Sequence, residues 1–234
     1  MRGLFVTGTD TGVGKTVLSA SLLAAMVAAG ERVRAYKPVL TGLDEAPESA
    51  DAGAWPRDDE LLGAAAGMSP ADVAPLRYGP AVSPHLAAEL AGEQISPERL
   101  CARARGIVAQ GSAAQRLIVE GVGGLLVPLA AGYTVRELAL AVGLPLLVAA
   151  RPGLGTINHT LLTLEAARDA GLEVRAVVLT PWPAAPDVLE RSNRATIERL
   201  GEVEVQTLER LESPALDELA RAGESLPWRR WLGM

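Results

Sequence analysis

The sequence has 234 residues, 49% of them apolar and only 3% aromatic, with a formal net charge of −6. This length predicts one large α/β domain over residues 1–234 with an aliphatic core, and the negative charge argues against a nucleic-acid partner, because no excess of cations can neutralise a phosphate backbone. No apolar run is long enough to cross a bilayer, so we expect no membrane association and a location in the cytoplasm.

Short aliphatic segments that are apolar on both faces alternate with helical segments along the chain. Burial on both faces is typical of parallel strands with helices on each side. The predicted strands are 3–7, 33–37, 116–120, 144–149 and 174–180. The predicted helices are 15–29, 58–66, 84–91, 97–110, 135–142, 157–170 and 186–199. This alternation predicts a doubly wound, mostly parallel sheet flanked by helices.

Other segments have a different character. Residues 42–57 and 180–187 are rich in loop-forming residues, and 180–187 contains three prolines. The C-terminal WRRW sequence at 228–231 is expected to pack its tryptophans on the body of the protein, with a docking tail as the alternative.

A glycine-rich segment, GTDTGVGKT at 8–16, follows the first strand and opens the first helix, as in P-loop NTPases. Glycines let backbone N–H groups approach a phosphate, and the helix N-terminus adds the positive end of its dipole. The strict motif has Gly where this sequence has Thr9, so the match departs by one residue. We expect Lys15 to reach the β- and γ-phosphates and Thr16 to ligate magnesium. The residues expected to hold the nucleotide are Gly12, Val13, Gly14, Lys15, Thr16 and Val17.

A second phosphate-site element is the apolar strand that ends at Glu120. Parallel sheets bind ligands at the carboxyl ends of their strands, and a carboxylate there can join the oxygen ligands of magnesium. The glycine-rich run Gly121, Val122 and Gly123 follows, and it lets the backbone approach the nucleotide.

Lysine is rare in this sequence: of 22 Lys and Arg residues, only Lys15 and Lys37 are lysines. Lys37 ends the second predicted strand, so its side chain should lie at the same edge of the sheet as Lys15. A second ammonium group there can stabilise charge that develops on a transferring phosphoryl group or an attacked carboxylate.

Taken together, five motifs resemble those of the dethiobiotin synthetases. They are VTGTDTGVGKT, YKPV followed by TG, SPH, VEGVGG and GTINHT, in the order of that family, and they cover residues 3 to about 200. The resemblance implies a homodimer that uses ATP, magnesium and carbon dioxide to convert 7,8-diaminononanoate to dethiobiotin in biotin biosynthesis. One amine forms a carbamate, the γ-phosphate activates it as a mixed anhydride, and the second amine closes the ureido ring.

The resemblance also implies roles for individual residues. Contacts to the carbamate and the phosphates would come from Thr11, Lys15 and Lys37. The magnesium ligands would be Thr16, Glu120 and a carboxylate at the start of the helix after the variable loop, which is Asp58 with Asp59 as a near alternative. The diamine or carbamate would touch Thr41, and the substrate groove would be lined by Ser83 and Pro84. The segment that reaches the substrate's carboxylate tail from the partner subunit would include Gly155, Thr156 and Asn158.

The sequence departs from the family at two places. Many members have an Asn-Asp pair after the fifth strand that reads the adenine edge, where this chain has Thr180 and Pro181. Thr lacks the paired donor and acceptor of Asn, and Pro has no N–H. We therefore hypothesise that base recognition is relaxed and that other nucleoside triphosphates are accepted, with Trp182 near the base. Gly12 stands where some members carry an acidic residue, so only its backbone is assigned a role. The histidines, His85 and His159, fall inside the motifs and are expected to be structural hydrogen-bonding residues rather than bases.

Three other classes of protein fit the sequence less well. A partitioning ATPase would carry a second Lys at the place of Asp10, and an amidoligase would carry a glutaminase domain with a nucleophilic Cys. A nucleotide-binding module without chemistry would not account for Lys37 or for the SPH and NH segments.

Overall fold

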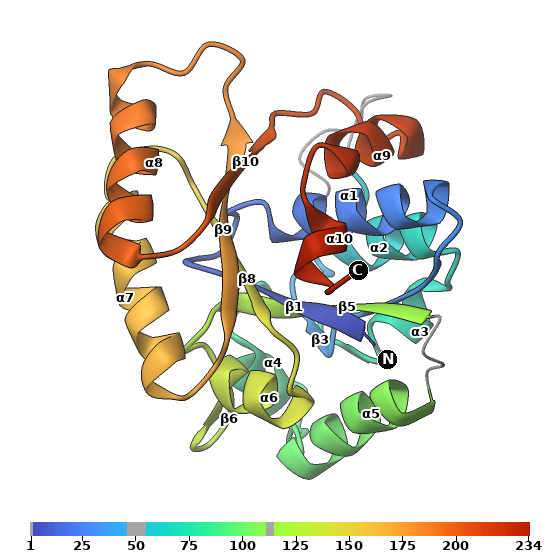
Figure 1. Cartoon of the computed structure of the whole chain (residues 1–234). Coiled ribbons are helices and arrows are strands. Elements are labelled where there is room, and N and C mark those ends of the chain that lie inside the picture. Colours follow the sequence, from blue (N-terminus) through green and yellow to red (C-terminus); the bar gives the residue numbers. More distant parts are fainter. Residues whose placement is uncertain (1, 46–54, 111–114) are drawn as a thin grey trace.

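The computed structural model describes residues 2–45, 55–110 and 115–234. At its centre, the sheet has six strands in the order β10-β9-β8-β1-β5-β2, and every neighbouring pair is parallel (Figure 1). These strands are β1 (Arg2–Gly8), β2 (Arg32–Tyr36), β5 (Gln115–Gly124), β8 (Leu146–Ala150), β9 (Val174–Trp182) and β10 (Val205–Glu209). Two short pairs lie outside it: β3 (Val39–Leu40) with β4 (Leu76–Arg77), and β6 (Pro128–Ala130) with β7 (Tyr133–Thr134).

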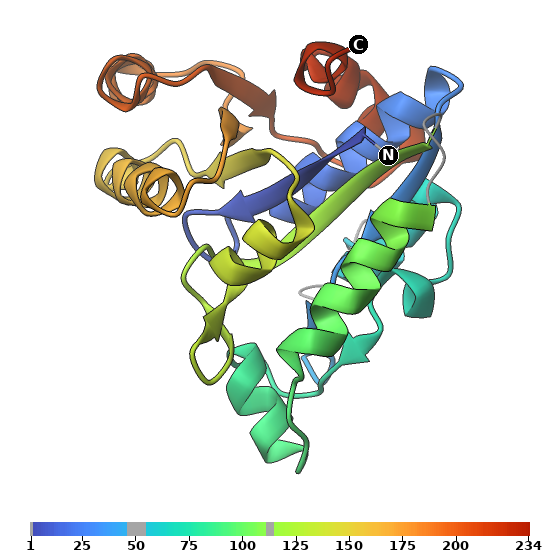
Figure 2. The ribbon, with the colours of Figure 1, turned by 60° about the horizontal axis from the view of Figure 1, so that its bottom comes forward.

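Helices cover both faces of this sheet (Figure 2). One face carries α1 (Lys15–Ala28), α2 (Asp58–Ala66), α3 (Pro70–Val73), α9 (Leu216–Glu224) and α10 (Trp228–Trp231). The other face carries α4 (Pro84–Leu90), α5 (Pro97–Gln110), α6 (Val135–Val142), α7 (Thr156–Asp169) and α8 (Val188–Gly201). Within the described residues, no helix combines the length and the apolar character needed to span a membrane.

Alternation along the strands sends successive side chains to opposite layers. Leu4 and Val6 of β1 belong to the apolar cluster shared with α1, α9 and α10, whereas Phe5 between them belongs to the cluster with α5 and α6. Because each strand is covered on both faces, both sets must be apolar, and the predicted doubly wound sheet is confirmed.

The structure extends several predicted elements and adds others. Strand β5 continues to Gly124, so the glycines after Glu120 are strand residues, and β9 continues to Trp182, so the predicted loop 180–187 begins later than expected. Strand β10 was not predicted, since its sequence VQTLE has polar residues that an edge strand with one partner tolerates. Of the predicted loop 42–57, residues 46–54 lie outside the described part.

The C-terminal segment forms the short helix α10 on the body of the protein. Both tryptophans are buried, with Trp228 0% and Trp231 2% exposed, which confirms the prediction that they pack on the fold. Helix α9, also not predicted, lies against α1 and brings this segment to the sheet (Figure 1).

Candidate functional site

The phosphate loop joins the carboxyl end of β1 to the N-terminus of α1. Gly12 and Gly14 have positive φ angles of 68° and 85°, a conformation that Gly adopts without strain. Gly14 is the N-cap residue of α1, so the helix begins at Lys15 and its free N–H groups face the loop. The Lys15 ammonium donates a hydrogen bond to the backbone oxygen of Asp10 at 2.9 Å, within the same loop.

A buried charge cluster lies beside this loop. The Lys37 ammonium is 2.6 Å from Glu120 Oε1 and 2.9 Å from Asp58 Oδ2, and the Thr16 hydroxyl donates to Glu120 Oε1 at 3.0 Å. The side chains of Lys37 and Glu120 are 3% and 1% exposed, whereas that of Asp58 is 40% exposed. The four side chains come from α1, β5, α2 and the end of β2, so the tertiary structure assembles the cluster at one edge of the sheet.

Burial and charge shift the pKa values of three of these groups. Burial lowers the pKa of Lys15 to about 8, and the neighbouring Lys37 ammonium adds to that effect. Burial alone would lower the pKa of Lys37 too, but Asp58 and Glu120 raise it above its usual range. Burial would raise the pKa of Asp58, yet the Lys37 ammonium holds it below its usual value. The cluster therefore keeps Lys37 and Asp58 charged at neutral pH, while Lys15 titrates near pH 8.

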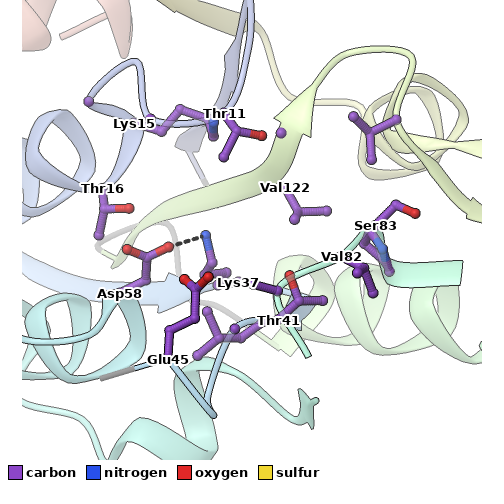
Figure 3. A pocket seen from close by; sticks show the side chains of 18 of the residues that line it. Thr11, Lys15, Thr16, Lys37, Thr41, Glu45, Asp58, Val82, Ser83 and Val122 are labelled. Atoms are coloured by element: carbon purple, nitrogen blue, oxygen red, sulfur yellow. Dashed lines mark ion pairs between the residues drawn. The ribbon is translucent and has the colours of Figure 1, made fainter. Parts of the chain in front are cut away.

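A pocket of about 750 Å³ opens onto this cluster (Figure 3). It lies at the carboxyl edge of the parallel sheet, where doubly wound folds bind ligands. Most of the residues predicted from the sequence line it, namely Thr11, Gly12, Gly14, Lys15, Thr16, Val17, Lys37, Thr41, Asp58, Ser83, Pro84, Val122 and Gly123. Glu120 lies behind this lining and contacts it through Lys37 and Thr16.

The adjacent carboxylates Asp58 and Asp59 have different surroundings. Asp58 lines the pocket, whereas Asp59 is 0% exposed and its Oδ2 lies 2.5 Å from the Arg77 guanidinium of β4. Asp59 therefore fixes α2 against β4, and of the two alternatives left open by the sequence, only Asp58 faces the pocket.

Some predicted residues lie away from the pocket lining. Val13 is buried in the core, and Gly121 lies within β5, where an added Cβ would approach Val135 to 2.9 Å. Thr180 is buried with its side chain against Gly14, and Pro181 follows it in β9. The three residues predicted to reach the substrate tail from a partner, Gly155, Thr156 and Asn158, lie at the start of α7 outside the pocket.

Two side chains that the sequence interpretation missed hold the loop between β8 and α7. Arg151 donates a hydrogen bond to the backbone oxygen of Thr11 at 2.9 Å, which links this loop to the phosphate loop. Asn193 of α8 is buried and donates to the oxygens of Pro152 and Gly153 at 2.9 and 3.1 Å. Arg151 follows the end of a parallel strand, a position that the strand-end rule could have flagged. Asn193 carried no such signal, because it lies inside an ordinary helical pattern.

A third missed residue, Glu45, also lines the pocket. The histidines do not match their predicted role: His85 and His159 are exposed, and among the described residues no hydrogen bond to either imidazole is found.

Comparisons with known proteins find relatives that cover most of the chain. A family model described as an AAA domain matches residues 2–212. The chain is 43% identical over 201 residues to a protein of Anaeromyxobacter dehalogenans (strain 2CP-C), with 86% of each chain covered. It is 41% identical over 205 residues to one of Mycobacterium avium (strain 104), with 87% of this chain and 85% of that one covered. It is 36% identical over 200 residues to one of Bacillus subtilis (strain 168), with 86% and 83% covered. All three are named ATP-dependent dethiobiotin synthetase.

Solved structures share the fold at low sequence identity. The cell division ATPase MinD of Pyrococcus furiosus aligns with a TM-score of 0.55 and 17% identity, covering 96% of this chain and 99% of that one. Chloroplast FtsY of Physcomitrella patens aligns with a TM-score of 0.53 and 13% identity, covering 95% of this chain and 64% of that one. At these identities the likeness concerns the fold alone.

Proposed function

This chain belongs to the ATP-dependent dethiobiotin synthetases, and we propose that the pocket at the carboxyl edge of its sheet carries out the family's reaction through a carbamate and a carbamic-phosphoric anhydride. It is an ATP-dependent ligase that forms carbon–nitrogen bonds. The observation that carries the mechanism is the meeting of Lys15, Lys37 and the Thr16–Asp58–Glu120 oxygens at one pocket. We propose that residues 1–234 form a single catalytic domain and that the protein acts in the cytoplasm.

The donor set of this pocket fits magnesium. Thr16 offers a hydroxyl, and Asp58 and Glu120 offer carboxylates, all of them the hard oxygen ligands that magnesium prefers. Glu120 Oε2 is buried and has no hydrogen-bond partner among the described residues, so this atom can bind a cation. The described residues contain no group of three or more His, Cys, Asp and Glu that would form an all-protein site. Magnesium commonly uses one or two carboxylates together with substrate phosphates, so this set is sufficient. When bound, the metal would neutralise charge on the β- and γ-phosphates.

Different residues of the chain contact different parts of the substrates in this proposal. Lys15 and the backbone N–H groups of the phosphate loop hold the triphosphate, at about 1.5–3 kcal/mol for each charge-assisted hydrogen bond. Lys37, together with Thr11, stabilises the carbamate and the charge on the phosphoryl group as it moves from ADP to the carbamate oxygen. Thr41 and the Ser83–Pro84 wall orient the diamine, so that its second amine reaches the anhydride carbonyl and displaces phosphate.

Lys37 and the metal share the same carboxylates in this proposal. Its ammonium contacts Asp58 and Glu120, the two groups assigned to magnesium. Lys37 would be available to the anionic carbamate if those oxygens held a divalent cation, because the cation would offset part of their charge.

Base recognition is proposed to be relaxed. Thr180 turns its side chain toward Gly14 rather than into the pocket, and Pro181 has no N–H to donate. A comparison of kcat/KM for ATP, CTP and GTP tests this, and strong selectivity for ATP would overturn it.

The active form is proposed to be a homodimer. Apolar side chains lie exposed just before α7 and in its middle, with Leu154 91% and Leu162 55% exposed, and a second copy of the chain would cover them. Residues 155–158 of that copy would then contact the carboxylate tail of the diamine. Mixing chains that carry Lys37→Ala with chains that carry Asn158→Ala tests this shared site. Regained activity in the mixture supports it, and a chain that sediments as an active monomer would overturn it.

The function is tested by release of phosphate from ATP in bicarbonate buffer with magnesium. We expect phosphate release to depend on 7,8-diaminononanoate and to match dethiobiotin formation one to one. Phosphate release at the same rate with and without the diamine would contradict the proposed reaction.

A further inference from the structure

The pocket contains one carboxylate that the proposed mechanism does not use. The charged side chains that line it are Lys15, Lys37, Glu45 and Asp58. Asp58 is paired with Lys37, and Lys15 donates to the backbone of its own loop. Among the described residues, the Glu45 carboxylate has no ion pair and no side-chain hydrogen bond.

The backbone around Glu45 is held in place by the neighbouring segment. Backbone N–H groups of Gly42, Leu43 and Asp44 donate to the oxygens of residues 80, 78 and 79, at 3.1, 3.2 and 2.9 Å. The Glu45 N–H donates to the oxygen of Gly42 at 3.3 Å, which closes a turn.

The same turn directs the Glu45 side chain into the pocket. A Cβ added to Gly42 would lie 3.6 Å from Glu45 Oε2, so the carboxylate folds back across this glycine, whose φ is 88°. Figure 3 shows the carboxylate directed into the pocket, between Asp58 and Thr41 in this view.

The substrate has a charge that this carboxylate can meet. Alkyl amines have pKa values near that of Lys, so at neutral pH a diamine enters the pocket as ammonium groups. The phosphate side of the pocket presents the cations Lys15 and Lys37, which repel an ammonium. Gly12, one of the phosphate-loop residues in the lining, has no side chain that could offset them.

We propose that Glu45 is a specificity-determining residue that binds the ammonium group of the diamine. This inference rests on the proposed function, since it assigns the amine-recognition part of the same pocket. The pair holds one amine on the Thr41 side while the other faces the phosphate loop. Before its bond-forming step the held ammonium gives its proton to the Glu45 carboxylate or to water, so the pairing positions the amine and the neutral amine reacts. Neutralising Glu45 should weaken binding of the diamine and leave binding of ATP unchanged.

The test compares Glu45→Gln with Glu45→Asp and with Asp44→Asn in the full chain. Glu45→Gln keeps the size of the side chain and removes its charge, and we expect KM for the diamine to rise about tenfold, the effect of one charge-assisted hydrogen bond at a partly exposed site. KM for ATP and the magnesium requirement should stay at the wild-type values. Glu45→Asp keeps the charge and should retain part of the affinity. Asp44→Asn removes a neighbouring carboxylate that does not line the pocket, and it should behave like wild type.

Two outcomes would overturn this assignment. One is an unchanged KM for the diamine in Glu45→Gln, and the other is a raised magnesium requirement with an unchanged KM for the diamine, which would make Glu45 a metal-site residue. Calorimetric titration of the diamine into each chain with bound ADP gives a second measure that does not need turnover. If the wild-type chain itself shows no diamine-dependent release of phosphate, the proposed function fails instead, so the two failures are distinguishable.

Discussion

Helix α1 takes part in two regions that are held together by different forces. At its N-terminus it presents Lys15 and Thr16 to a cluster of buried charges, which costs desolvation and is offset by ion pairs. Along its middle it packs on α9 so closely that a Cβ at Gly223 would lie 2.0 Å from the oxygen of Ser21. The charged end supplies chemistry at a cost in stability, and the apolar side supplies stability without chemistry. Substitutions in the two regions should therefore separate activity from folding.

The largest effect is expected in the charged region, from Lys37→Ala. Turnover should fall by at least about 10²–10³, the usual loss when one preorganised donor to a transition state is removed. Nucleotide affinity should change little, because Lys15 and the phosphate loop hold the ground state. Steady-state rates and calorimetric titration with ADP measure the two effects separately.

Lys15→Ala is the control for that division of roles, since it should damage both turnover and nucleotide binding. A collapse of nucleotide affinity in Lys37→Ala would show that the roles are not divided as proposed. Because Glu120 loses its ion pair with the Lys37 ammonium in Lys37→Ala, the melting temperature of that variant should be compared with and without magnesium.

The apolar region should show the opposite pattern. Trp228→Ala removes a side chain that is 0% exposed, and we expect the free energy of unfolding to fall by about 3–5 kcal/mol. The kinetic constants of the folded fraction should stay unchanged, as checked by urea unfolding and by assays at low temperature. Met234→Ala, at the same end of the chain but 48% exposed, is the matched control. A large loss of kcat in folded Trp228→Ala would break the comparison.

Between the two regions lies the loop that Asn193 holds. Asn193→Ala removes the side-chain amide that donates to the oxygens of Pro152 and Gly153, and the Gly153 oxygen keeps only the longer hydrogen bond from the Thr156 N–H at 3.3 Å, so the change should cost about 1–3 kcal/mol of stability. Because the same loop contacts the phosphate loop through Arg151, KM for ATP should rise as well. Ser192→Ala, one residue away and exposed, should change neither quantity. An unchanged KM for ATP would show that the loop does not position the site.

The smallest effect is expected from pH. The pKa of Lys15 is about 8 in the free chain, so above pH 8 the amine is increasingly neutral. Bound phosphates favour the ammonium form, so binding then requires uptake of a proton, and affinity should fall by up to about tenfold per pH unit. Lys37 stays charged across this range, because its carboxylate partners raise its pKa.

Calorimetric titration with ADP between pH 7 and 9.5 checks this, and Lys15→Arg, whose charge does not titrate there, should flatten the profile. A wild-type affinity that stays constant over the range would contradict it. The stability of the ligand-free chain should change with pH in the opposite direction. Burial disfavours the Lys15 ammonium in the folded state, so the free energy of unfolding should rise as pH increases from about 8 toward the ordinary value of 10.5.

The sequence was informative where short-range patterns determine the local structure. Runs such as 144–149 are apolar on both faces and predicted buried parallel strands, and the Gly-Lys-Thr run predicted a loop before a helix. It gave no clear pattern for β10, whose polar residues suit an edge strand. Helix α9 was missed although its buried residues Leu219, Ala222 and Gly223 follow a helical spacing that could have predicted it. Asp58 was preferred on the resemblance alone and Asp59 stayed as a near alternative, because neighbouring helix residues differ mainly in the direction they face.

What the sequence determined by itself is therefore the sheet with its phosphate loop, because both follow from hydrophobic period and short-range geometry. The family of the chain and most of the site residues came from the resemblance of its five motifs to those of the dethiobiotin synthetases. Only the tertiary structure decided that Asp58 rather than Asp59 faces the pocket, that Glu45 enters it, and that Asn193 and Arg151 hold a loop against Thr11. Each of these depends on contacts between residues far apart in the chain, and such contacts leave no local pattern in the sequence.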